Sequence, residues 1–226
     1  ELLEKAGNEL RELLGRLGGK NAVENRFYMG MTERLLESCL VDADRTDAAD
    51  FESGRKNVEP ETDKLWKEMK LRMDGRLAGF PEGGRIPELR RDISDRCSEF
   101  ADHRTGAVRL VVPTGGGKTL ASLRFAIDYC LNQQGMKKII YTAPFMSILE
   151  QNSDELRAIA GDEAFLEHYS DIFAELDTAE ELAEQELKCE RWTDPVIATT
   201  MVQLLNSLFS GKLASLRRFR RLGRAV

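Results

Sequence analysis

The sequence predicts an α/β protein, with helices alone in its first part and a parallel sheet in its second. Two observations predict this class. Up to about residue 80, apolar residues recur at helical spacing. From about residue 87 onward, short apolar runs alternate with segments of helical periodicity. Repeated strand–helix units of this kind form parallel sheets with helices on both faces.

The first part is expected to be helical as far as a polar linker. Residues 1–17 form an amphipathic pattern of leucines that Gly18 and Gly19 interrupt. In order, we then expect a helix over about 21–41, an acidic run over 42–50, a polar linker containing Gly and Pro over 51–62, and a short helix around 65–77.

The second part is expected to alternate between helices and strands. In order, the predicted elements are a helix over 88–102, a strand over 107–112, a helix over 118–132, a strand over 137–143, a helix over 147–160, a strand over 195–200 and a helix over 201–209. Residues 171–190 are acidic and are expected to be an insertion, with a surface helix over 179–190. Residues 211–226 are basic, for which a solvated helix face is favoured over a nucleic-acid or partner contact.

Composition excludes membrane and secreted proteins. No apolar run in the 226 residues approaches the roughly 18 residues of a membrane span, and no signal-peptide pattern opens the chain. Four well-separated cysteines without a Cys-x-x-Cys pair argue against a zinc site and fit a cytoplasmic protein. The net charge of −6 gives no global attraction to nucleic acid, so any such contact is expected to be local.

The most informative segment lies between the predicted strand 107–112 and the helix that follows it. It reads Pro113-Thr114-Gly115-Gly116-Gly117-Lys118-Thr119. Glycines let the backbone approach phosphate oxygens closely, and a helix N-terminus directs free N–H groups and its positive dipole end toward them. Lys118 can reach the β- and γ-phosphates, and the Thr119 hydroxyl can ligate Mg²⁺. We therefore predict an ATP and Mg²⁺ site over residues 114–119. A glycine-rich turn with a solvated lysine is the alternative.

Three segments resemble motifs of superfamily 2 helicases. Residues 111–119, VVPTGGGKT, resemble motif I, with Val112 where other phosphate loops begin with glycine. The run TAPFMSILEQN resembles motif Ia, and two threonines followed by Gln203 resemble a later motif of the same lobe. In that RecA-like architecture, these segments hold the phosphates of a single strand without reading its bases. The resemblance implies nucleic-acid contacts at Pro144, Gln151, Thr199 and Thr200.

Structural roles remain open for some of these residues. Pro144 could simply end a strand, and Thr199-Thr200 could be a strand end whose second threonine caps the next helix. The ordered series of motifs favours the helicase interpretation. Arg90-Arg91 lie where helicases often carry an adenine-reading segment, although the glutamine usual in that segment is missing.

A more specific resemblance is to the CRISPR-associated type I helicase–nuclease. Residues 192–200, WTDPVIATT, with Gln203 and SLFSGK, resemble its first motor lobe, and residues 34–51, RLLESCLVDADRTDAADF, resemble the end of its HD nuclease domain. The resemblance implies an all-helical HD-domain remnant over 1–57, a linker helix and loop over 58–86, and a parallel-sheet P-loop (RecA-like) lobe over 87–226.

The same resemblance implies what the parent enzyme does. It would unwind DNA from 3′ to 5′ with ATP and Mg²⁺, degrade single-stranded DNA with a divalent transition metal, and be recruited by a crRNA-guided surveillance complex. Among the nuclease ligands it implies Asp44, with Asp42 as second choice. The alternative for both is an acidic surface cluster.

The sequence is expected to be an internal piece of that enzyme. No Asp-Glu pair follows a predicted strand, and His103 and His168 both lie beyond the linker, so no catalytic set is complete. We therefore expect weak nucleotide binding and negligible hydrolysis. Another superfamily 2 helicase or translocase, or a non-hydrolysing nucleotide-binding module, are the alternative functions.

Overall fold

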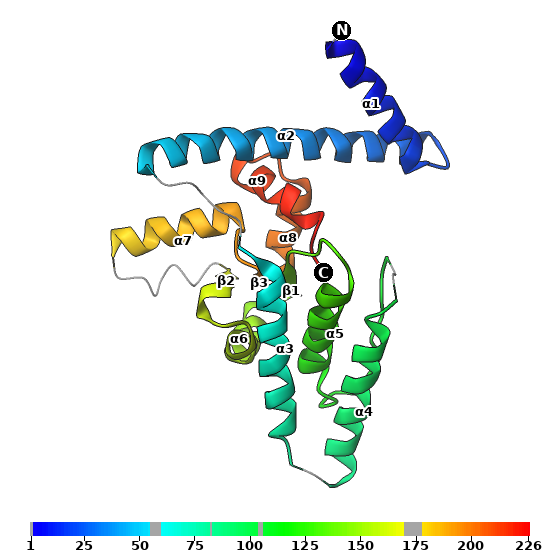
Figure 1. Cartoon of the computed structure of the whole chain (residues 1–226), viewed down its shortest axis with the longest axis vertical. Helices are drawn as coiled ribbons and strands as arrows, with labels where there is room; N and C mark the ends of the chain where they lie inside the picture. The colour runs from blue at the N-terminus through cyan, green and yellow to red at the C-terminus, as the bar shows by residue number, and fades with distance from the viewer. Residues whose placement is uncertain (1, 55–59, 82, 104–105, 170–177) are drawn as a thin grey trace.

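The structure, a computed structural model, describes residues 2–54, 60–81, 83–103, 106–169 and 178–226. Its elements in chain order (Figure 1) are α1 Leu2–Leu17, α2 Ala22–Ser53, α3 Thr62–Ala78, α4 Arg85–Phe100, α5 Lys118–Asn132, β1 Ile139–Ala143, α6 Met146–Ala160, the 3₁₀ turn η1 Asp162–Ala164, β2 Phe165–His168, α7 Ala179–Arg191, β3 Val196–Thr200, α8 Met201–Phe209 and α9 Leu213–Leu222.

Helix α2 is longer than the sequence pattern predicted. It begins at the N-cap Asn21, whose side chain accepts hydrogen bonds from two backbone N–H groups, and it ends at Gly54 in the left-handed conformation. The acidic run 42–50, expected to follow the helix, lies within it. The expected end at residue 41 is therefore wrong, because Asp42 is paired with arginines of α9 and does not need solvent.

The described strands form one parallel sheet in the order β1-β3-β2. Ala143 at the end of β1 pairs with Thr200 at the end of β3, so both strands end at the same edge. The predicted strands at 137–143 and 195–200 are confirmed. Strand β2 was not predicted: it has four residues and directly follows η1.

The main core lies where α3, α5 and α6 pack together and against the sheet. Trp66, Met69 and Met73 of α3 are fully buried and join Ile127 of α5 and Leu149 of α6 in one apolar cluster. Helix α3 lies within residues 58–86, which were expected to form a linker, yet it contributes the largest side chain of this core. The domain boundaries themselves stay a prediction.

The predicted strand over 107–112 is wrong. These residues have no regular secondary structure, and Val108, Leu110 and Val111 are exposed. A strand requires a hydrogen-bonding neighbour, and in the described part of the chain the free side of β1 and of Lys138 pairs with residues 224–226 instead. Residues 107–112 thus retain the apolar composition of a strand without its pairing.

Helices α1 and α2 lie outside the sheet region. Figure 1 shows α2 lying across α9, with α1 projecting from the N-terminal end of α2. The expected helices around 179–190 and in the basic segment 211–226 are present as α7 and α9. Among the described helices, none combines the length and apolar character needed to cross a membrane.

Candidate functional site

The predicted phosphate loop has a backbone that only glycines adopt easily. Gly115 and Gly117 have φ angles of +80° and +78°. A Cβ on Gly116 would lie 3.0 Å from the carbonyl oxygen of Pro113, to which the Gly116 N–H donates at 3.1 Å. Side chains would strain or fill this tight turn, so the glycines here serve the backbone.

The loop leads directly into the N-terminus of α5. Gly117 is the N-cap and has no side chain to satisfy the first N–H groups of the helix. The Lys118 side chain is exposed and has no ion pair or hydrogen bond with the described residues. Free N–H groups, a helix dipole and an ammonium group together suit a polyphosphate, and the Thr119 hydroxyl suits Mg²⁺. The residues present therefore fit Mg-ATP.

Helix α4 holds the loop from the side. The Arg90 Nε donates to the Gly115 carbonyl at 2.9 Å, and the Arg90 stem lies beside Gly117. A cavity of about 450 Å³ opens next to this contact and is large enough for a small ligand. It is lined by Asp74, Leu77, Ala78, Phe80, Pro81, Pro87, Arg90, Arg91, Ser94, Asp95, Gly117, Leu120, Ala121 and Arg124. The position of Arg90-Arg91 in the sequence indicated this neighbourhood, but not the contact with the loop.

A second contact joins the loop helix to α6. The Thr119 Oγ1 donates to the Asn152 Oδ1 at 3.1 Å, and the Asn152 Nδ2 donates to the Ile148 carbonyl at 2.6 Å. Sequence reasoning missed Asn152 and selected its neighbour Gln151. The only signal was its presence in the run TAPFMSILEQN.

The predicted nucleic-acid residues do not all reach the surface. Pro144 and Gln151 are exposed, and Thr200 is half-buried at the N-cap of α8, where its Oγ1 accepts from the Gln203 N–H at 3.3 Å. Thr199 is fully buried, and its Oγ1 donates to the His168 carbonyl at 2.8 Å. The Thr199 side chain joins the central strand β3 to β2 and is not exposed in this structure, and its predicted contact with nucleic acid stays a prediction.

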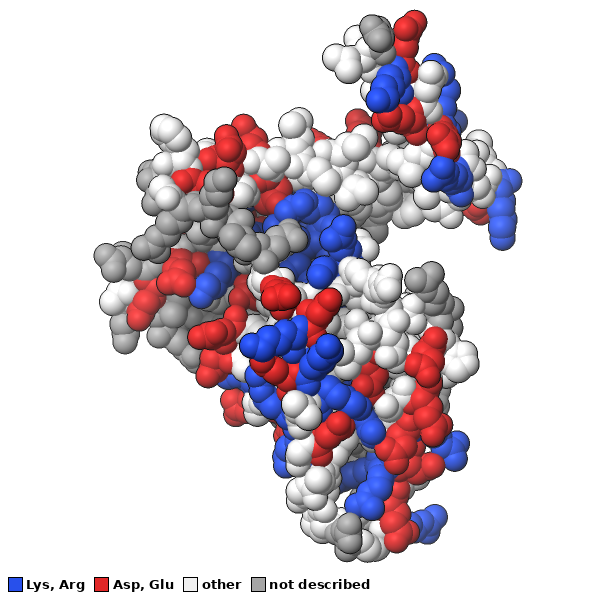
Figure 2. Space-filling view, in the orientation of Figure 1, with Lys and Arg blue, Asp and Glu red and all other residues white. Residues whose placement is uncertain are grey.

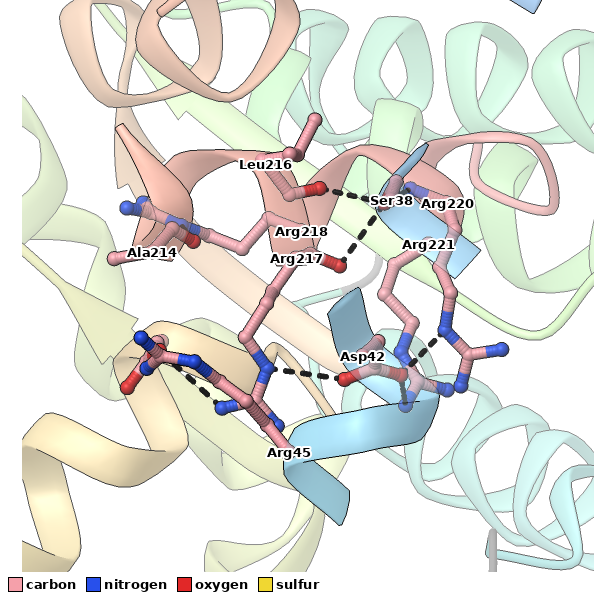
Figure 3. A network of polar contacts seen from close by, with 10 residues as sticks. Ser38, Asp42, Arg45, Ala214, Leu216, Arg217, Arg218, Arg220 and Arg221 are labelled. Atoms are coloured by element: carbon pink, nitrogen blue, oxygen red, sulfur yellow. Dashed lines mark hydrogen bonds and ion pairs between the residues drawn. The ribbon is translucent and has the colours of Figure 1, made fainter. Parts of the chain in front are cut away.

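The second-choice metal ligand, Asp42, lies in a buried ion-pair network between α2 and α9 (Figure 3). The Arg217 Nε donates to Asp42 Oδ1 at 3.2 Å, while the Arg220 Nε and an Arg221 Nη lie 2.5 Å and 3.3 Å from Oδ2. Ser38, one helical turn earlier, donates to the Leu216 carbonyl. Both Asp42 oxygens are thus used by arginines, so Asp42 as a metal ligand is wrong for this structure.

Asp44 is exposed on α2, two residues after Asp42. Within the described ranges, no group of three or more His, Cys, Asp and Glu side chains could hold a metal ion. The histidines lie elsewhere: His103 stacks on Phe100, and His168 is buried beside Trp192. These residues thus bring no further ligand to Asp44.

The basic segment 211–226 is not a solvated face. Arg217 and Arg218 of α9 are buried, and Figure 2 shows Lys and Arg side chains gathered where α9 meets α2. The preferred interpretation of this segment is therefore wrong: its arginines contact other parts of the same chain. An amphipathic pattern of arginines can face inward where the neighbouring element supplies carboxylates.

Comparison with known protein families identifies a helicase domain in the chain. The family model described as DEAD/DEAH box helicase matches residues 94–222, which is more than half of the chain. The matched range includes the phosphate loop, the sheet and the contact between Thr119 and Asn152, while Arg90 lies just before it. No curated protein matches the chain.

Proposed function

Because the chain belongs to the DEAD/DEAH box helicase family, whose members use ATP and Mg²⁺ and bind nucleic acid, we propose that it is the nucleotide-binding lobe of an ATP-dependent DNA translocase. The observation that carries this proposal is the phosphate loop at the N-terminus of α5. Residues 114–119 bind the triphosphate there.

The residues of the phosphate loop bind different parts of Mg-ATP. Backbone N–H groups of the loop and of the first turn of α5 bind phosphate oxygens, and Lys118 adds a charged donor toward the β- and γ-phosphates. Thr119 supplies a hydroxyl oxygen to Mg²⁺. Mg-ATP, when bound, supplies the phosphoryl-transfer chemistry. The cavity beside Arg90 accepts the nucleoside end.

Single-stranded nucleic acid binds along the sheet edge where β1 and β3 end. Pro144 directly follows Ala143, and Ala143 pairs with Thr200, so Pro144 and Thr200 lie at the same edge of the sheet. Exposed Gln151 lies on α6, the helix that follows β1. Amide and hydroxyl groups of this kind contact phosphates and sugars independently of base sequence.

The parent enzyme in this proposal is a CRISPR-associated helicase–nuclease. The resemblance of residues 34–51 and 192–212 to that family supports it, as does the close packing of α2 on α9. Single-stranded DNA would then be the substrate, and a crRNA-guided complex the partner. Asp44 would be one ligand of a divalent transition metal. Another superfamily 2 motor or a non-hydrolysing nucleotide module stay the alternatives.

Binding of a fluorescent ATP analogue in the presence of Mg²⁺ tests the nucleotide site. A Lys118→Ala variant should bind at least about tenfold more weakly, since a hydrogen bond to a charged group contributes roughly 1.5–3 kcal/mol. Lys64→Ala is the matched control, because Lys64 is an exposed lysine of α3 whose ion pair is with Glu68. It should bind like the wild type, and equal affinities of all three proteins would contradict the proposal.

A further inference from the structure

The hydrogen bond between Thr119 and Asn152 connects two sites that sequence reasoning treated separately. Thr119 belongs to the phosphate-loop helix, and Asn152 follows Gln151 on α6. The Asn152 amide is oriented from its other end, because its Nδ2 donates to the Ile148 carbonyl one turn earlier in α6. The Oδ1 that faces Thr119 is therefore an acceptor held in place.

A threonine hydroxyl has one proton and two lone pairs. When Asn152 accepts the proton, the lone pairs of Oγ1 are left for another partner. Mg²⁺ takes oxygen ligands in a strict octahedral geometry, so the orientation of a ligating hydroxyl matters more for it than for a softer or larger cation.

The helix itself gives this hydroxyl no acceptor. Threonine in a helix tends to donate to the carbonyl three or four residues earlier. Because α5 begins at Lys118, the residues at these two positions, Gly115 and Gly116, lie in the phosphate loop before the helix. The acceptor of the Thr119 proton is instead the Asn152 Oδ1, which comes from α6.

We propose that Asn152 is a positioning residue for Mg²⁺, which fixes the Thr119 hydroxyl so that its oxygen is available to the ion. This inference rests on the proposed nucleotide site and assigns a role to a residue outside the phosphate loop. Asn152 does not touch the nucleotide in this role. It acts through Thr119 alone.

The test compares affinities for a fluorescent ATP analogue in excess Mg²⁺ and in a chelator. The ratio of the two affinities isolates the contribution of the ion. Asn152→Ala should reduce the ratio about tenfold, the lower end of what removal of a supporting contact costs a metal site. Its affinity in the chelator should stay that of the wild type, which also shows that the variant is folded.

Two further variants separate positioning from a structural role. Asn152→Leu keeps a side chain of similar size but has no acceptor for the Thr119 proton, so it should reduce the ratio as Asn152→Ala does. Thr119→Val removes the hydroxyl, and adding Asn152→Ala to it should lower the ratio no further. Asn132→Ala, which loses a bond to Asp102 at the far end of α5, is the matched control.

The outcomes distinguish this inference from the proposed function. An unchanged ratio in Asn152→Ala, or a wild-type ratio in Asn152→Leu, would overturn the role of Asn152 while leaving the nucleotide site intact. A wild-type protein that binds the analogue neither with Mg²⁺ nor without it would overturn the proposed function and this inference together.

Discussion

His168 is a neutral, buried group at the end of β2. Its Nδ1 accepts a hydrogen bond from the Trp192 Nε1 at 2.9 Å, and the Arg218 guanidinium lies over the Trp192 ring. Burial, and secondarily the positive charge of Arg218, lower the pKa of His168 from 6.5 to about 3. A depressed histidine pKa means that the folded state resists a proton which the unfolded chain accepts.

The free energy of unfolding should therefore fall as the pH is lowered from about 6.5 toward 3. In that window, the unfolded state binds one more proton at this site, which costs up to about 1.4 kcal/mol per pH unit. His168→Gln should remove this part of the slope in denaturant unfolding measured at several pH values. His103→Gln, at an exposed histidine, should leave the slope unchanged, and a wild-type slope in both variants would contradict the assignment.

Single residues were predictable where their role depends on near neighbours in sequence. The phosphate loop could be read from the spacing of Gly115, Gly117 and Lys118, and its backbone has the expected positive φ angles. Asn152 could not be identified, because its partner Thr119 is 33 residues away and only the packing of α6 brings them together. The burial of Thr199 was likewise hidden, since it depends on β2 lying beside β3.

The contact of α2 with α9 contains one fully buried carboxylate, Asp42. Glu190 of α7 also pairs with Arg217 of α9 and with Arg45 of α2. Asp42 is 1% exposed and faces three arginines of α9, one of which, Arg217, is 3% exposed. Removing one partner from a buried ion pair leaves the other charges without compensation. The α2–α9 packing is therefore more sensitive to Asp42 than to any exposed acidic residue of the same helix.

Asp42→Asn should lower the free energy of unfolding by about 3–5 kcal/mol, the usual cost of breaking a buried pair. Denaturant unfolding measures this change. Asp44→Asn is the matched control, because it is the same substitution on an exposed position of α2, and it should stay within about 0.5 kcal/mol of the wild type. Equal losses in the two variants would contradict the network as the source of stability.

Helices were easier to predict than strands for a physical reason. A helix satisfies its backbone internally, so the periodicity of α5 and α6 gave their positions within one residue. A strand needs a partner that the local sequence does not specify. Strand β2 exists because β3 lies beside it, while the more apolar residues 107–112 have no such neighbour among the described strands.

At the scale of the whole molecule, apolar surface remains next to the functional site. Val108 and Val111 are 48% and 77% exposed just before the phosphate loop. Exposed apolar segments of high β-propensity promote pairing between chains.

We therefore expect the protein to self-associate in a concentration-dependent manner, which sedimentation velocity would measure. Val111→Lys should weaken this association, because a lysine in an apolar segment or at a strand edge opposes pairing with a second chain. Leu71→Lys tests whether replacing any exposed apolar residue weakens association, since Leu71 is 71% exposed on α3. It should associate like the wild type. If Leu71→Lys and Val111→Lys weakened association equally, general surface hydrophobicity would be its cause. A wild-type protein that stays monomeric at all concentrations would show that segment 107–112 does not pair with a second chain.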